Sequence, residues 1–347
     1  MTENIFKKIY IRKENIYPEA RVPIVPDDII KLMNIGFTVF VESSENRIYD
    51  DDCYERCGAI ITTKLWYDDE FKKFLIIGLK ELQDLDKLDW HKHIYFSHSY
   101  KGQPGADVIL SKFSKSNSVI YDFEYILNNR NKRLISFGYY AGIVGGLLGI
   151  IQYYHKLALN KDIENLSFSD SADEIIDNIY ILNNIKRPFV TIIGANGMCG
   201  SGVRYVLEEL DLDYKIIDNT DENYKDIMLE SDIFYNCIKL SEDYNEVWFD
   251  ENTEFHKPII ICDISCDYMK PNNPIKIYNQ RTTWEKPIYN YNNYVSIIAI
   301  DNLPSFLPRE SSNYFSEKLV SLLEEYANGD KSGIWRRAEI EFNKRII

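Results

Sequence analysis

Short, continuous apolar runs bounded by polar turns recur along the chain. Runs of this length, without apolar–polar alternation, are typical of parallel strands that are buried on both faces. Helical stretches separate them, among them 27–34, which ends before Gly36, and 201–210. Strands that alternate with helices predict open, helix-covered sheets, so we expect an α/β fold. The runs that we expect to be strands are 5–11, 37–42, 74–79, 94–97, 134–137, 189–193, 214–217, 233–237 and 258–264.

The length of the chain, 347 residues, favours two such domains. The alternation fills the first third, gives way to an apolar segment and a polar stretch over 137–173, and then starts again. We expect two Rossmann-like, doubly wound domains with a cleft between them. The first comprises 1–136 together with 310–347, and the second comprises 137–309. The segment 310–347 is expected to be wholly helical and to return to the first domain.

The apolar segment Phe137–Leu159 contains tyrosines, Gln152, His155 and Lys156 as well as several glycines. It is too polar to span a bilayer and suits a buried or domain-bridging helix. The N-terminus lacks the apolar stretch of a signal peptide, and the C-terminus is not a peroxisomal address. The expectation is a soluble, cytoplasmic protein that does not contact membranes.

Net charge and cysteine spacing disfavour two further classes. A formal net charge of −14 argues against broad nucleic-acid binding, which requires a basic surface. Cys53 and Cys57 share CxxxC spacing with Cys262 and Cys266, so zinc is an alternative. Neither pair has the tight turn chemistry of a structural zinc site, and six cysteines are few for a disulfide scaffold. We expect no metal.

A glycine-rich turn follows the run 190–193 and precedes a helix. Gly194 permits a tight turn, Gly197 allows a pyrophosphate to approach the backbone, and Gly200 allows the helix to pack closely on the strand. The helix N-terminus then offers N–H groups to phosphates. Asp218 ends the next strand and suits the ribose hydroxyls, which favours NAD over NADP. The alternative is a glycine-rich turn that binds nothing.

Lys80 and His98 each follow an apolar run, at the carboxyl end of an expected strand. Ligands of open α/β sheets bind at these ends. A lysine desolvated there can act as a base near neutral pH. Taken alone, each residue is more often structural or solvent-facing than catalytic, but the pair on neighbouring strands favours chemistry. The other histidines, His91, His93, His155 and His256, are expected at the surface.

Two arginines have carboxylate-binding potential. Arg21 lies in the proline-braced segment 18–26, and Arg133 precedes the expected strand 134–137. A guanidinium on a fixed loop suits bidentate recognition of a carboxylate. For either residue alone, a surface salt bridge is an equally good interpretation.

Several segments together resemble a known family. The pattern Arg12-x-Glu14-x(4)-Glu19-Ala-Arg21-x-Pro23-x-x-Pro26 resembles the opening of the alanine dehydrogenase/saccharopine dehydrogenase superfamily. Other segments narrow the resemblance to saccharopine dehydrogenases of the NAD, L-lysine-forming type, and the matches run in order over nearly the whole chain. These segments are 76–81, 98–103, 121–124, 137–142, 194–202, 263–267, 273–275 and 300–310.

The resemblance implies oxidative cleavage of saccharopine to L-lysine and 2-oxoglutarate, with NAD as oxidant, in lysine biosynthesis by the aminoadipate route. It implies that Lys80 is the base toward the secondary amine and that His98 is the acid–base group for hydrolysis of the imine. It implies that the first domain binds the substrate and the second binds NAD. By the same resemblance the substrate contacts are Arg21, Gln103, Arg133, Phe137, Ser265, Cys266 and Asp267.

The resemblance also assigns cofactor contacts to Gly194, Gly197, Met198, Gly200, Asp218, Lys132, Lys239, Ile264, Ile300, Asp301, Asn302 and Leu303. It implies that Cys199 and Cys237 can form a disulfide, which a reducing cytoplasm would keep mostly reduced. Met198, Lys239 and Asn302 depart from the family pattern, so the resemblance is weakest on the cofactor side. We expect a monomer. The alternatives are an alanine dehydrogenase-like enzyme and a binding or regulatory homologue with little turnover.

Overall fold

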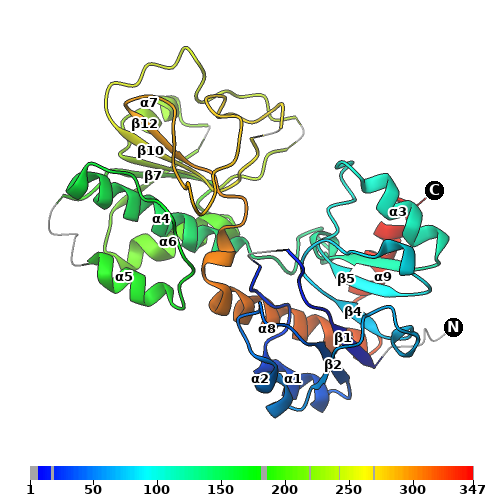
Figure 1. Ribbon diagram of the computed structural model, residues 1–347. Coiled ribbons are helices and arrows are strands. Elements are labelled where there is room, and N and C mark those ends of the chain that lie inside the picture. The colour runs from blue at the N-terminus through cyan, green and yellow to red at the C-terminus, as the bar shows by residue number, and fades with distance from the viewer. Residues whose placement is uncertain are drawn as a thin grey trace. The chain divides into compact units, whose positions relative to one another are not determined.

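The structure is a computed structural model that describes residues 7–16, 19–180, 186–218, 220–241, 243–268 and 270–346. The chain divides into two compact units. One comprises Met1–Ser136 and Pro308–Ile347, and the other comprises Phe137–Leu307. Each unit contains one six-stranded sheet (Figure 1). The α/β fold with two Rossmann-like sheets is confirmed.

All strands of the first sheet run parallel, in the order β3-β2-β1-β4-β5-β6. The chain moves outward from central β1 on one side and then crosses to β4 on the other, which is the doubly wound order. The strands are β1 (Lys8–Ile11), β2 (Thr38–Glu42), β3 (Ile60–Thr62), β4 (Leu75–Ile77), β5 (Lys92–Tyr95) and β6 (Val119–Asp122). The helices of its N-terminal part are α1 (Pro26–Asn34), α2 (Asp51–Arg56) and α3 (Ala106–Lys115).

The C-terminal segment belongs to this first unit. It forms α8 (Pro308–Ala327) and α9 (Ile334–Asn343), coloured orange to red in Figure 1. Buried hydroxyls of α8 bind the segment before α1. The backbone N–H groups of Val22 and Val25 donate to Ser312 Oγ and Ser316 Oγ, each at 3.0 Å. The expected return to the first domain is confirmed. The segment is not wholly helical, because Gly329 and Gly333, at φ +90° and +70°, turn the chain between the two helices.

The second sheet has the order β11-β12-β10-β9-β7-β8. Its strands are parallel except β11, which is antiparallel to β12. They are β7 (Val190–Ile193), β8 (Tyr214–Ile217), β9 (Ile233–Asn236), β10 (Ile259–Asp263), β11 (Tyr289–Asn290) and β12 (Val295–Ile298). The helices of this unit are α4 (Gly138–Leu159), α5 (Ala172–Tyr180), α6 (Met198–Glu209) and α7 (Tyr224–Leu229).

Each face of this sheet has its own core. In β9, Ile233 and Tyr235 join one apolar cluster and Phe234 joins the other, as alternating residues of a strand must. On the first face, α4 packs against α6 through glycines (Figure 1). A side chain on Gly142 would collide with the carbonyl group of Cys199, so only glycine permits this approach.

Some expected elements differ from the structure. The segment 134–137 is not a strand; Leu127 instead bridges Arg133 in an antiparallel turn, and Phe137 caps α4. Helix α6 begins at Met198 rather than Ser201, because the glycine turn ends at Gly197. Residues 5 and 6 of the first expected strand lie outside the described residues. His91 and His93 were expected at the surface but are buried, each 1% exposed, because His93 in β5 and His91 just before it both pack against Trp66.

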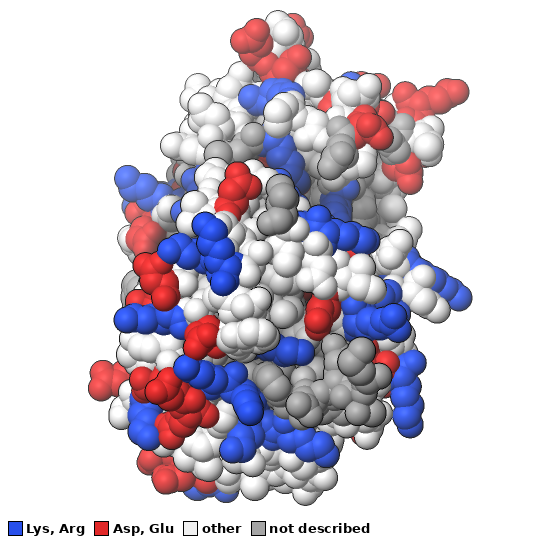
Figure 2. All heavy atoms as spheres, turned by 90° about the vertical axis from the view of Figure 1, so that its right-hand side faces the viewer, with Lys and Arg blue, Asp and Glu red and all other residues white. Residues whose placement is uncertain are grey.

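The surface carries charges of both signs. On the face shown in Figure 2, Lys and Arg side chains are interspersed with Asp and Glu. Among the described residues, no helix is long and apolar enough to cross a membrane. In the same part of the chain, no group of three or more His, Cys, Asp and Glu side chains is placed to hold a metal ion.

Candidate active site

The carboxyl edge of the first sheet contains its topological switch point, between β1 and β4. Crevices at such points bind ligands in open α/β sheets. Arg12 follows β1 directly, and Lys80 follows β4 after two residues. Strand β5 pairs with β4 in parallel register, Ile77 opposite Ile94, so Lys80 and His98 follow adjacent strands, as expected.

Lys80 lies at the edge of a buried ion-pair cluster. Its Nζ atom is 3.8 Å from Glu19 Oε2, and its side chain is 25% exposed. Arg21 binds the same carboxylate through two hydrogen bonds, from Nε to Oε1 at 2.8 Å and from Nη2 to Oε2 at 2.6 Å. Burial would raise the pKa of Glu19, but Arg21 and Lys80 outweigh it and hold that pKa below its usual value. The Glu19 carboxylate that faces the Lys80 amine therefore stays ionised to a lower pH than usual.

Glu14 holds the chain at the position of Lys80. Its carboxylate accepts the backbone N–H groups of Leu79 at 2.7 Å and Lys80 at 2.9 Å. Arg12 pairs with Glu14 at 3.3 Å and also donates to the carbonyl oxygen of Lys80. A Cβ on Gly78 would collide with the Arg12 guanidinium. The strand end that carries Lys80 is thus held by buried charged groups.

His98 is exposed and occupies a left-handed backbone conformation, φ +50°. Such a conformation is uncommon for a residue other than glycine and needs support from its surroundings. The neighbouring Ser97 supplies it, donating its N–H and Oγ to Asp122 Oδ2 at 3.2 and 2.6 Å. Ser97 Oγ also lies 2.7 Å from Ser99 Oγ. The turn presents the imidazole at the carboxyl end of β5.

Glu124 binds two basic side chains beside this turn. Its carboxylate binds Lys101 Nζ at 2.5 Å and Arg133 Nη2 at 2.9 Å. Burial opposes ionisation, but the hydrogen bond from Lys101 and the charge of Arg133 lower the pKa of Glu124. Burial raises the pKa of Asp122, and the nearby charge of His98 is a smaller effect that lowers the pKa of both Asp122 and Glu124, so the imidazole lies near both acids. Gln103 accepts the N–H of Lys101 at 2.9 Å.

The acidic partners were not assigned roles from the sequence, although the basic residues were. They are Glu14, Glu19, Asp122 and Glu124. Arg12, which binds Glu14, and Ser97, which binds Asp122, also received no role. The available signals were the nearness of Glu14 to the end of β1, of Glu19 to Arg21, and of Asp122 and Glu124 to the end of β6. Arg21 was predicted to bind a substrate carboxylate, and its guanidinium binds the internal carboxylate of Glu19. A substrate contact by Arg21 stays a prediction.

The glycine loop of the second unit has the geometry of a phosphate-binding turn. Gly194 adopts φ +78°, and a side chain on Gly200 would collide with the carbonyl group of Gly194. A Cβ on Gly197 would meet only the Gly194 carbonyl oxygen, at 3.3 Å, so the turn is open at this residue. Helix α6 starts at Met198, which is 42% exposed. The turn thus fits a diphosphate at the helix N-terminus.

Asp218 lies beside this turn. Ile193 pairs with Ile217 in parallel register, so the residues after them are neighbours at the carboxyl edge. Asp218 is exposed and accepts Thr220 N and Oγ1 at 3.2 and 3.3 Å. A carboxylate at this place fits ribose hydroxyls.

The ends of β9, β10 and β12 bring further predicted residues to the same edge. Ser265 Oγ donates to the Ile238 carbonyl at 2.5 Å, Cys266 Sγ to that of Ala299 at 3.3 Å, and Asp267 pairs with Lys270 at 2.8 Å. Asp301 is exposed and pairs with Arg281 at 3.1 Å. The other residues placed at this edge are Lys239, Ile264, Ile300, Asn302 and Leu303.

Asp263, at the end of β10, is a buried acid that sequence reasoning passed over. It accepts Asn236 Nδ2 at 2.8 Å and the hydroxyl of Tyr278. Burial raises the pKa of Asp263 to about 6 in spite of these bonds. The carboxyl group braces the turn that follows β10, because it also accepts the N–H of Cys266 at 3.2 Å.

Cys199 and Cys237 are brought together as free thiols. Their side chains hydrogen-bond, and this bond together with burial raises the pKa of Cys237 well above its usual value.

Phe137 is buried at the start of α4. Lys132 is exposed in the turn Leu127–Arg133 of the first unit. Contacts of these residues with ligands stay predictions.

Comparison with known proteins gives consistent relationships. Residues 10–144 match the family model "Alanine dehydrogenase/PNT, N-terminal domain". The chain is 32% identical to a saccharopine dehydrogenase [NAD(+), L-lysine-forming] of Emericella nidulans, over 98% of this chain and 97% of that protein. It is 35% identical to a protein of the same name from Candida glabrata, over 97% and 96%. Among solved structures, an L-alanine dehydrogenase has a TM-score of 0.71 at 14% identity, covering 96% of this chain and 94% of that one. This last likeness shows the fold alone.

Proposed function

Because the chain belongs to the family of saccharopine dehydrogenases [NAD(+), L-lysine-forming], an oxidoreductase family, we propose that it cleaves saccharopine oxidatively to L-lysine and 2-oxoglutarate. We assign the substrate chemistry to the first unit and NAD to the second. The observation that carries the proposal is the placement of Lys80 and His98 at the ends of adjacent parallel strands, among buried acids.

The second unit supports NAD binding through the residues that would hold it. The open turn at Gly197 and the N-terminus of α6 suit the diphosphate, and exposed Asp218 suits the adenosine ribose. NAD supplies the hydride acceptor. A free carboxylate at Asp218 would repel a 2′-phosphate, which favours NAD over NADP.

Lys80 would take the proton from the secondary amine of saccharopine. Hydride leaves the carbon bearing the amine only when the nitrogen has a free electron pair, so a base must act first. The Lys80 amine is partly exposed, so a substrate amine can reach it, and its Nζ atom lies 3.8 Å from the Glu19 carboxylate. The Glu14 clamp holds the backbone of this residue in place.

His98 would manage the protons of imine hydrolysis. Water addition requires a group that takes a proton, and collapse of the carbinolamine requires one that returns it to the departing amine. An imidazole can do both near neutral pH. The Asp122 and Glu124 side chains lie near His98 and surround the imidazole with acidic groups.

The three carboxylates of saccharopine need cationic partners. Arg133 and Lys101 both bind the Glu124 carboxylate near His98, and Arg21 binds the Glu19 carboxylate that also faces Lys80. We propose that Arg133 and Gln103 contact the substrate directly. Each is only partly buried, so its polar end is within reach of a ligand.

The test is the appearance of NADH absorbance with saccharopine, with alanine and with neither. We expect a rise with saccharopine alone. A rise with alanine instead would identify an alanine dehydrogenase-like enzyme. NAD binding by calorimetry without turnover of saccharopine would identify a binding homologue and refute the proposal. This outcome is included because Met198, Lys239 and Asn302 depart from the family pattern.

A further inference from the structure

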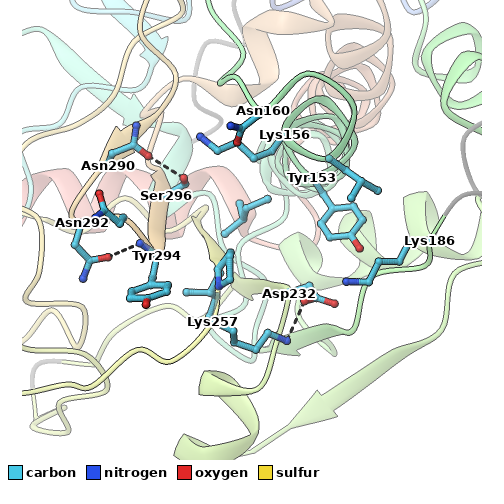
Figure 3. A pocket seen from close by; sticks show the side chains of 15 residues that line it. Tyr153, Lys156, Asn160, Lys186, Asp232, Lys257, Asn290, Asn292, Tyr294 and Ser296 are labelled. Carbon is cyan, nitrogen blue, oxygen red and sulfur yellow. Dashed lines mark hydrogen bonds and ion pairs between the residues drawn. The ribbon is translucent and has the colours of Figure 1, made fainter.

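A pocket of about 860 Å³ lies in the second unit, away from the glycine loop (Figure 3). Its walls come from the last turns of α4, the residues preceding β7 and β9, the start of β10, and the β11–β12 hairpin. It therefore lies at the amino edge of the sheet, whereas every predicted cofactor residue of this unit lies at or beyond the carboxyl edge. Its volume is within the range of small-molecule sites.

Three acceptor side chains of this pocket are already engaged. Asp232 accepts the N–H of Phe189 at 2.9 Å and pairs with Lys257 at 2.9 Å. Asn290 Oδ1 accepts Ser296 Oγ at 2.9 Å. Asn292 Oδ1 accepts the N–H groups of Tyr294, just before β12, and of Val295, its first residue, at 2.8 and 2.9 Å. These three side chains therefore have little remaining capacity to accept hydrogen bonds from a ligand.

Two donors of the pocket are not engaged by any residue that the structure describes. Lys186 makes no ion pair with these residues, and the hydroxyl of Tyr153 has no hydrogen-bond partner among them. Tyr153 is only 9% exposed, so folding removes water from its hydroxyl, and no described residue replaces that hydrogen bond. In Figure 3 the Lys186 amine is directed toward Tyr153 and Asp232. A buried polar group without a partner costs free energy that a ligand can recover.

Further cations and an apolar wall complete the lining. Lys156 and Lys257 are paired with Asp162 and Asp232, yet each ammonium retains other N–H groups. Lys156 also offsets the negative end of the α4 dipole at this place. Leu157, Pro258 and the exposed ring of Tyr294 supply apolar surface. We propose that this pocket binds a small organic anion, whose carboxylate or phosphate accepts from Lys186 and Tyr153 and whose apolar part lies against Tyr294.

The test compares phenyl phosphate, benzoate and benzylamine as probes by saturation-transfer NMR on the full chain, with NAD present to fill its own site. We expect at least one of the two anions to bind and benzylamine not to bind. Phenyl phosphate and benzoate distinguish a phosphate from a carboxylate as the preferred group. Binding of benzylamine in preference to both anions, or binding of none of the three, would overturn the proposal.

Variants locate the binding. Lys186→Ala and Tyr153→Phe should each weaken anion binding, the first by roughly tenfold, since a charge-assisted hydrogen bond is lost. Lys215→Ala on β8, the strand at the far edge of the sheet, is the matched control and should bind as the parent does. Tyr153→Phe should also keep or raise the melting temperature, because it removes a hydroxyl without a described partner. Equal binding in all variants would refute the site. None of these readouts depends on turnover of saccharopine.

Discussion

At the scale of single residues, the site depends on how the charges of the first unit are paired. Lys80 is the predicted base, and its amine is reachable while its backbone is held by Glu14. Lys80→Met keeps the length of the side chain but removes the amine. We expect turnover of saccharopine to fall by about 10²–10⁴, the usual contribution of an acid–base group.

The control for Lys80→Met is the affinity for NAD measured by calorimetry, which should not change, because Lys80 and the glycine loop belong to different units. An unchanged rate would mean that another group takes the proton.

The buried pair of Glu19 and Arg21 predicts a stability effect at the same scale. Glu19→Gln leaves the Arg21 guanidinium, 4% exposed, without its bidentate partner, which should cost about 3–5 kcal/mol in the free energy of unfolding. Since the pKa of Glu19 is lowered in the folded state, its contribution is complete above the unfolded value near 4.5 and is lost as pH falls through the folded value.

Urea unfolding of the parent and of Glu19→Gln at neutral and acidic pH measures this effect. The matched control is the exposed pair Arg187–Asp211, 3.0 Å apart, where Asp211→Asn should leave the free energy of unfolding nearly unchanged, because solvent screens this pair. Equal costs for both substitutions would contradict the prediction.

At the scale of elements, the glycine contact between α4 and α6 determines where the nucleotide turn lies. An alanine at Gly142 would gain helix propensity but would push on the carbonyl group of Cys199 in the first turn of α6. We expect Gly142→Ala to lower stability by about 1–3 kcal/mol, the usual cost of overpacking, and to weaken NAD binding.

Gly146→Ala is the graded control for this contact, one turn further along α4. Its Cβ would lie 3.3 Å from the Cβ of Val206, a tight but tolerable approach. We expect a change in melting temperature close to zero and an unchanged affinity for NAD. Similar losses from both substitutions would show that the contact with α6 is not specific to Gly142.

At the scale of the whole molecule, acid sensitivity should come from the first unit. Burial lowers the pKa of His91 to about 4 and lowers that of His93 as well. Both imidazoles pack edge-on against Trp66, with ring centroids 5.1 and 4.8 Å away. They stay neutral in the folded chain but take up protons once unfolded, so stability should fall as pH drops below the ordinary histidine value of 6.5.

The expected slope for His93 alone is at most about 1.4 kcal/mol per pH unit. His93→Phe should flatten the decline in urea midpoint between neutral pH and pH near 5, while His256→Asn, at an exposed position, should leave it unchanged. A parent protein equally stable across this range would contradict the prediction.

The sequence by itself determined the α/β class, the glycine turn after β7, the strand-end positions of Lys80 and His98, and the return of the last helices. All but the last of these features are local, because apolar runs, positive-φ glycines and strand ends are specified by neighbouring residues; the return of the last helices was inferred from the order of the segments. The acids that surround the predicted bases were not assigned from the sequence. Ion pairs such as Lys80 with Glu19, and the backbone clamp by Glu14, join residues far apart in the chain.

Only the tertiary structure decided those pairings, the burial of His91 and His93, and the turn that replaces the expected strand 134–137. It also decided why α4 is rich in glycine: Gly142 and Gly146 leave space for α6, and Gly145 and Gly149 leave space for Ile264 and for Tyr235. The physical reason is the same in each case. Local propensity depends on the residue and its neighbours, whereas burial, pKa and ion pairing depend on which distant segments pack against them.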